Sequence, residues 1–144
     1  MLSRPVSSNQ TSIHPDLEKR VLVHRRCRYP RPFAEHSQQQ FDRLLNILHT
    51  ASKPVVLDSG CGTGDSTVQL AERYPDHWVI GVDRSAHRLA KHTGSESILL
   101  RNNLLLLRMD LVDLWRLLPS SDHQLDYHYL FYPNPWPLKK HLQR

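Results

Sequence analysis

Apolar and polar residues alternate along this chain with two periods, which predict helices and strands in turn. Phe41, Leu44 and Leu48 recur at helical spacing and predict a helix over residues 37–50. Ser37 is its expected N-cap. Beyond it, strands are expected over 54–60, 77–84, 103–110 and 125–136, and helices over 65–74, 85–92 and 111–118. Strands that alternate with helices pair in parallel through right-handed crossovers, so the pattern predicts an α/β fold.

A polar residue stands at the end of each expected strand. In chain order these residues are Asp58, Asp83, Asp110 and Asn134. The carboxyl ends of parallel strands meet at one edge of the sheet, and ligands bind there in folds of this kind. We therefore expect the four residues to lie around one ligand site.

The turn after the first strand reads DSGCGTGDS and holds three closely spaced glycines, Gly60, Gly62 and Gly64. A dinucleotide fingerprint has the spacing G-x-G-x-x-G, but here Asp65 occupies its last position. A pyrophosphate at this turn would meet the carboxylates of Asp58 and Asp65, so a nicotinamide cofactor is disfavoured. S-adenosylmethionine, which carries an ammonium and a sulfonium and no phosphate, fits the acids better.

The remaining acids can hold the other parts of such a cofactor. Asp83 follows the turn at roughly the 20-residue spacing at which an acid binds ribose in nucleotide folds. Asp110 ends the third strand, where it could accept a hydrogen bond from the adenine amino group.

The charge of the chain is concentrated at its two ends. The 144 residues carry a formal net charge of +5, which makes RNA a plausible partner, although such runs are also common on solvated surfaces. The basic residues are Lys19, Arg20, Arg25, Arg26, Arg28 and Arg31 near the N-terminus and Lys139, Lys140, His141 and Arg144 at the C-terminus. We expect a mobile basic extension over residues 1–36 and a folded domain over 37–144.

Cysteine content and hydropathy limit where the protein works. Cys27 and Cys61 have no metal-ligand spacing, so we expect neither a metal site nor a disulfide, as in a reducing compartment. No apolar run reaches the roughly 20 residues of a membrane span, and no signal peptide is evident. We therefore expect a soluble cytoplasmic protein without a membrane partner.

The order of four segments, GCGTG, IGVDRS, NLLLLRMD and LFYPNPWP, resembles the bacterial tRNA (guanine-N7-)-methyltransferase family among the class I S-adenosylmethionine-dependent methyltransferases. This resemblance implies a Rossmann-like doubly wound parallel sheet, which in this chain stops after the fourth strand. It also implies that the glycine turn and Asp58 hold the methionine end of the cofactor, that Asp83 binds the ribose, and that Asn103 and Asp110 belong to the cofactor site.

The proline-bound loop is the more specific part of the resemblance. Asn134 stands at the family's catalytic aspartate, and the resemblance implies that the neighbours Pro135, Trp136, Lys139 and Lys140 bind the substrate. The family's His-Lys pair is replaced by Pro137 and Leu138. Guanine N7 has a free lone pair, so methylation needs alignment and not a general base.

Two alternatives stay open at this point. The chain could be a methyltransferase of the same fold with a small-molecule or protein substrate, or a non-catalytic RNA-binding module. The fourth strand would be an uncovered edge, which invites self-association or a partner chain that completes the sheet.

Overall fold

The computed structural model describes residues 12–131, and this range divides into two compact units, residues 12–32 and 33–131. The first unit holds one helix, α1 (Leu17–Arg26), none of whose residues is buried. The second unit holds the sheet and all the expected site residues that the structure describes. Over residues 12–131, no helix has the length and apolar character needed to cross a membrane.

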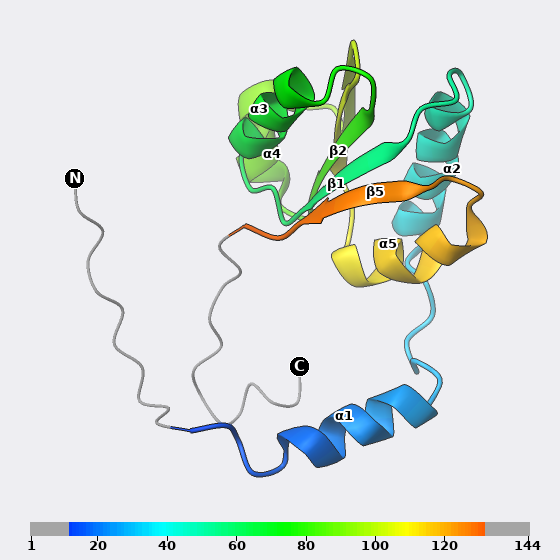
Figure 1. The fold of residues 1–144 in the computed structure, drawn as a ribbon, viewed down its shortest axis with the longest axis vertical. Helices are drawn as coiled ribbons and strands as arrows, with labels where there is room; N and C mark the ends of the chain where they lie inside the picture. The colour runs from blue at the N-terminus through cyan, green and yellow to red at the C-terminus, as the bar shows by residue number, and fades with distance from the viewer. Residues whose placement is uncertain (1–11, 132–144) are drawn as a thin grey trace, which may run out of the picture. The chain divides into compact units, whose positions relative to one another are not determined.

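The sheet of the second unit has five strands in the order β3-β4-β2-β1-β5 (Figure 1). Four of them run parallel, as the alternating pattern predicts. Their register sets Asp58 beside Gly81, and Asp83 beside Arg108. The parallel strands are β1 (Val55–Ser59), β2 (Trp78–Asp83), β4 (Leu104–Arg108) and β5 (Leu125–Tyr129).

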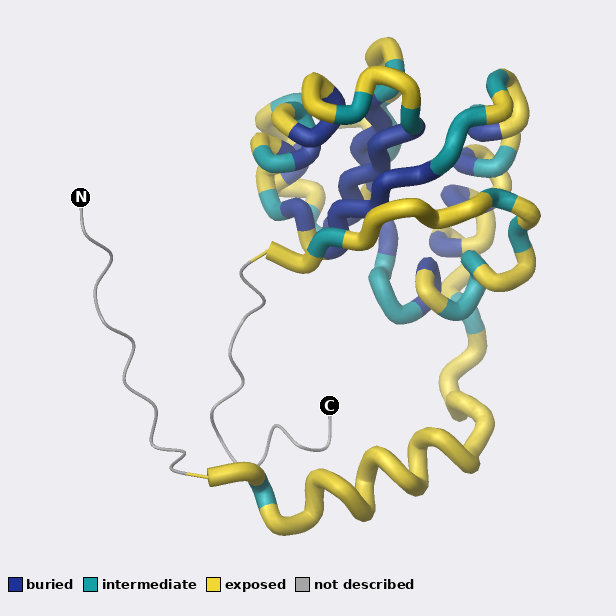
Figure 2. The backbone as a smooth tube through the Cα atoms, viewed as in Figure 1, coloured by how far each residue is buried: buried dark blue, intermediate teal, exposed yellow. Residues whose placement is uncertain are grey.

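Helices cover both faces of the sheet, which confirms the doubly wound α/β architecture. On one face, helices α2 (Glu35–Leu48) and α5 (Leu111–Leu117) pack on alternate strand residues. On the other face, α3 (Asp65–Arg73) and α4 (Ala86–Thr93) pack on the strand residues between them. The central strands are therefore buried along their length, as the dark blue segments in Figure 2 show.

Two local features differ from the sequence-based expectation. A short strand, β3 (Ile98–Arg101), pairs antiparallel with β4 through a two-residue turn, and this hairpin was not predicted. Asn102 takes a positive φ of 54° in that turn, a conformation that asparagine tolerates better than most residues. Helix α2 begins at Glu35, so Ser37 is a buried residue of the helix and not its N-cap.

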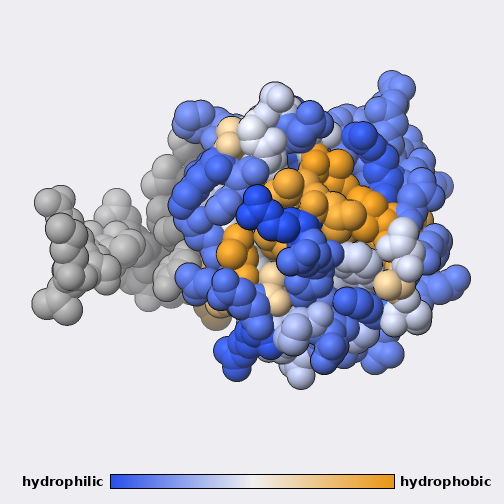
Figure 3. All heavy atoms as spheres, turned by 90° about the horizontal axis from the view of Figure 1, so that it is seen from above, coloured by the Kyte–Doolittle hydropathy of each residue, from blue (hydrophilic) through white to orange (hydrophobic). Residues whose placement is uncertain are grey.

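Strand β5 forms one edge of the sheet, as expected for the fourth parallel strand. Four of its five residues are exposed, among them the large side chains of Leu125 and Tyr127. In the view of Figure 3, hydrophobic residues reach the surface as one band bordered by hydrophilic ones. The Tyr129 hydroxyl of β5 lies 2.6 Å from that of Tyr74, the C-cap residue of α3.

Candidate cofactor site at the glycine turn

Asp58 lies at the carboxyl end of β1 and is almost fully buried. Its Oδ2 accepts hydrogen bonds from Ser66 Oγ at 2.6 Å and Thr67 Oγ1 at 2.8 Å. Gly81 on β2 leaves the space for Thr67, because an added Cβ would lie 2.8 Å from the Leu106 side chain and closer still to Thr67 Oγ1. The other oxygen, Oδ1, is buried and has no hydrogen-bond partner among the described residues. A buried carboxylate oxygen without a partner is costly unless a ligand supplies a donor.

The glycine turn continues from β1 into α3. The backbone N–H groups of Gly60 and Cys61 both donate to Val82 O, at 2.8 Å and 3.1 Å, which fastens the turn to β2. Gly64 has a φ of +89°, and an added Cβ would lie 2.9 Å from Leu106. Gly62 has a φ of +62°, but its added Cβ would meet nothing within 4 Å. The turn is therefore tightly packed at Gly64 and open at Gly62.

Asp83 ends β2 and holds the turn from its other side. Its Oδ2 accepts the Gly62 N–H at 3.1 Å, and its Oδ1 accepts the Ser85 N–H at 2.8 Å. The guanidinium of Arg88 stands 3.9 Å from Oδ2. A carboxylate oxygen has two lone pairs, so each oxygen of Asp83 keeps the capacity for a second donor.

Asp110 follows β4 and lies at the same edge of the sheet as Asp58 and Asp83. It is the N-cap of α5, and its Oδ1 accepts from the Val112 N–H at 2.9 Å. The structure therefore brings together three of the four polar residues that the sequence places at strand ends.

Asn103 does not belong to this edge, which corrects the expectation that it contacts the cofactor. It precedes β4 and so stands at the amino end of the strand, opposite the glycine turn. Its Nδ2 donates to three backbone carbonyls, those of Ala71 at 3.1 Å, Tyr74 at 2.9 Å and His77 at 3.2 Å. These bonds tie the end of α3 to the sheet, so the role of Asn103 is structural.

Asp65 is bound differently from what the sequence suggests. Its carboxylate accepts from Lys91 Nζ at 2.6 Å and lies 2.9 Å from His92 Nε2, both on α4. Hydrogen bonds from Lys91 and His92 hold the pKa of Asp65 well below its usual range. Since its charge is offset by Lys91, the acidity of the site comes from Asp58 and Asp83.

The expected catalytic and substrate-binding residues lie outside the described residues. They are Asn134, Pro135, Trp136, Lys139 and Lys140.

The Cys61 thiol is buried inside the glycine turn. Burial, with a contribution from nearby Asp58, raises its pKa to about 12. The thiol loses its proton at a higher pH in the folded chain than in the unfolded chain. The stability that the protonated thiol contributes is therefore lost as the pH rises toward 12. Only a thiolate is an effective nucleophile, so Cys61 should be unreactive in the native state.

Thiol labelling at pH 8 tests this environment. We expect exposed Cys27 to react quickly with an aromatic disulfide reagent, and Cys61 to react only after unfolding. In a Cys27→Ser chain, the native protein should show no fast-reacting thiol. Native labelling of that variant at the rate of the urea-unfolded chain would contradict the packing described for the turn.

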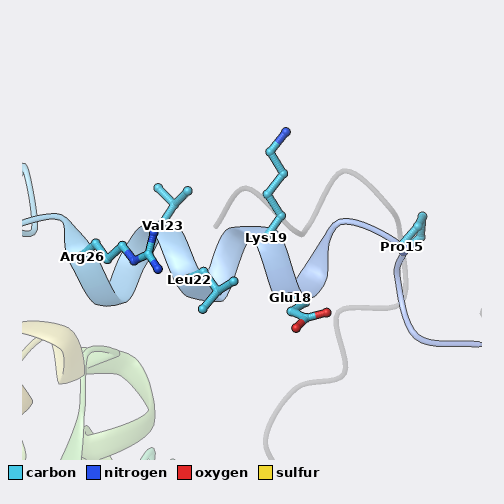
Figure 4. A pocket seen from close by; sticks show the side chains of 6 residues that line it. All are labelled: Pro15, Glu18, Lys19, Leu22, Val23 and Arg26. Carbon is cyan, nitrogen blue, oxygen red and sulfur yellow. The ribbon is translucent and has the colours of Figure 1, made fainter.

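A hollow along α1 lies in the first unit and is separate from the glycine turn in the sequence (Figure 4). Its side chains come from one helix and the segment before it, and they bring no acidic pair or glycine backbone together. They are Pro15, Glu18, Lys19, Leu22, Val23 and Arg26.

Comparison with known proteins places this arrangement in a family. A family described as "Putative methyltransferase" matches residues 52–144, which include the sheet from β1 onward. A tRNA (guanine-N(7)-)-methyltransferase of Saccharophagus degradans is 38% identical over 110 residues, or 72% of this chain and 46% of the relative. The enzyme of the same name from Methylobacillus flagellatus is 33% identical over 104 residues, or 70% of this chain and 42% of the relative.

A second class of relative matches a shorter stretch. A trans-aconitate 2-methyltransferase of Acidovorax sp. is 40% identical over 62 residues, or 43% of this chain and 24% of the relative. The chain spans less than half of the length of each of these three relatives.

Proposed function

The chain belongs to the methyltransferase family that matches residues 52–144, and from this we propose that it transfers a methyl group from S-adenosylmethionine to N7 of a guanine in tRNA. The observation that supports S-adenosylmethionine as the cofactor is the buried Oδ1 of Asp58, which has no partner among the described residues and lies beside an open glycine turn. The names of the longer-matching relatives support the substrate.

Asp58 is suited to a cationic group. Its Oδ2 is occupied by two hydroxyl donors, while its Oδ1 has none among the described residues. An ammonium group donates hydrogen bonds and supplies the opposite charge that a buried carboxylate needs. A phosphate would do neither, so the methionine end of S-adenosylmethionine fits this position better than a nucleotide phosphate does.

Asp83 and Asp110 are suited to the nucleoside part. Asp83 is held in place by the Gly62 and Ser85 amides and can accept from two neighbouring ribose hydroxyls. Asp110, fixed as the N-cap of α5, would face the adenine amino group. In this proposal Gly60, Gly62 and Gly64 let the backbone approach the ligand closely.

The reaction requires no proton transfer to or from a side chain, because guanine N7 carries no proton. When bound, S-adenosylmethionine would supply an activated methyl group on its sulfonium, with an N–C bond to guanine N7 forming as the S–C bond breaks and leaves its electrons on sulfur. The protein must hold the two reactants in line. We assign this task to Asn134, which can hydrogen-bond the base edge, with Pro135, Trp136, Lys139 and Lys140 against the RNA.

Binding of tRNA is also consistent with the basic helix α1. None of its residues is buried, so its cations can reach RNA phosphates and release the counterions bound there. They are Lys19, Arg20, Arg25 and Arg26. With a tRNA substrate, we propose that the protein works in the cytoplasm.

Methyl transfer to unmodified tRNA transcripts tests the proposal. We expect 7-methylguanosine in the digested product, detected by mass spectrometry, and none with an Asp83→Ala chain. No tRNA methylation by a chain that binds S-adenosylhomocysteine would exclude the tRNA substrate and leave the cofactor assignment intact.

A small acid is the second candidate substrate. The match to trans-aconitate 2-methyltransferases supports it, but that match covers 43% of the chain where the tRNA enzymes match 70% or more. Methylation of trans-aconitate by the purified chain, with no transfer to tRNA, would favour this candidate.

A Gly62→Ala chain tests whether the cofactor lies against Gly62, apart from any effect of the substitution on stability. Gly62 and Gly94 have nearly equal φ values, +62° and +60°, and an added Cβ has no neighbour within 4 Å at either position. Both alanine variants should therefore lose stability in thermal unfolding through backbone strain, and Gly94→Ala is strained further by its ψ of −122°. Only Gly62→Ala should also weaken S-adenosylhomocysteine binding, by about tenfold or more, because its methyl group stands where the cofactor would lie. Equal affinities in the two variants would remove Gly62 from the site.

A further inference from the structure

Three polar side chains meet directly beside the glycine turn. Ser59, the last residue of β1, is fully buried. Its Oγ accepts a hydrogen bond from Trp115 Nε1 on α5 at 3.2 Å, and it lies 2.8 Å from His128 Nε2 on β5. Ser59 precedes Trp115 by 56 residues and His128 by 69 residues in the sequence, and it fixes both of their rings.

Ser59 Oγ holds each ring through a polar atom. The indole N–H can only donate, so it occupies one lone pair of Ser59 Oγ. The same oxygen lies 2.8 Å from His128 Nε2, in a hydrogen bond for which either atom can be the donor. One buried oxygen therefore orients both rings.

Both rings nevertheless remain accessible. Trp115 is 41% exposed, although tryptophan is usually well buried, and His128 is exposed as well. Their ring centroids lie 6.0 Å apart and the planes meet at 70°. A fixed and accessible indole, with a second ring set across it, forms a corner at the carboxyl edge of a parallel sheet, where ligands of such folds bind.

We propose that Trp115 and His128 form a stacking site for a nucleobase of the RNA substrate, next to the cofactor. This inference rests on the proposed function. The corner offers aromatic surface and fixed geometry, which suit a planar uncharged group, and the chain carries the net charge of +5 that favours a polyanion. RNA-binding proteins hold unstacked bases on aromatic side chains in this way.

Three variants test the stacking site. Trp115→Leu removes the ring, and Trp115→Phe keeps a smaller ring. Tyr127→Leu removes a similarly exposed ring from the face of β5 opposite His128. Binding of a short single-stranded RNA is measured by fluorescence anisotropy. We expect about a tenfold weaker affinity for Trp115→Leu, a change of about threefold or less for Trp115→Phe, and no change for Tyr127→Leu. Equal losses in Trp115→Leu and Tyr127→Leu, or in both Trp115 variants, would overturn the proposal.

A second measurement follows the ring itself in the unmodified chain. With 5-fluorotryptophan incorporated, the ¹⁹F resonance of Trp115 is assigned by its loss in Trp115→Phe. We expect it to shift and saturate with single-stranded RNA, and to stay in place with inorganic polyphosphate. An unmoved resonance at saturating RNA, or no RNA binding, would overturn the stacking site. S-adenosylhomocysteine titration, run on the same samples, reports separately on the cofactor site.

Discussion

An Asp83→Ala chain is expected to lose S-adenosylhomocysteine binding by at least about 100-fold in isothermal titration calorimetry. Two effects combine in this variant. The carboxylate would accept from the ribose hydroxyls, and hydrogen bonds to a charged group contribute about 1.5–3 kcal/mol each. The same carboxylate receives the Gly62 and Ser85 amides, so its removal also loosens the turn.

Asp42→Ala provides the matched control, because Asp42 is an exposed acid on α2 and carries the same charge change. Its affinity should equal that of the unmodified chain. A folded Asp83→Ala chain with unchanged affinity would place the cofactor elsewhere.

A large loss of stability is expected for Gly64→Ala. Alanine at a φ of +89° is strained, and its Cβ would lie 2.9 Å from Leu106, a fully buried residue of β4. Strain and overpacking together should cost about 2–4 kcal/mol, which lowers the melting temperature of a domain of this size by about 10–20 °C. Thermal unfolding followed by circular dichroism measures the shift.

Leu106→Ala is the control for the close contact, since it removes the two Cδ atoms that lie 2.9 Å and 3.0 Å from the added Cβ. Gly64→Ala should lower the melting temperature much less in a Leu106→Ala chain than in the unmodified chain. If the two shifts are equal, the close contact between the turn and Leu106 is not what requires glycine at position 64.

Much of the fold could be predicted because the chain follows simple local rules. The helical period around Phe41 and Leu44 and the apolar runs of β1 and β2 reflect which faces are buried. A residue at the end of a parallel strand must lie at the ligand edge, so Asp58 and Asp83 were predictable from position alone.

The remaining features depend on contacts between distant segments. Asn103 has the residue type that the family motif requires. Its position before β4, however, puts it at the amino end of that strand, and its three carbonyl partners come from α3 and the segment beyond it. The pairing of Asp65 with Lys91 joins two helices on one face of the sheet, and no sequence periodicity connects the two positions. The link from Ser59 to His128 spans β1 and β5 in the same way.

Calorimetric titration of the unmodified chain with S-adenosylhomocysteine, beside NAD⁺, tests the central claim most directly. The buried carboxylates of Asp58 and Asp83 predict one binding site for S-adenosylhomocysteine and no binding of the pyrophosphate-containing NAD⁺. Binding of NAD⁺, or a folded chain that binds neither compound, would contradict the assignment of the glycine turn to a methyl donor.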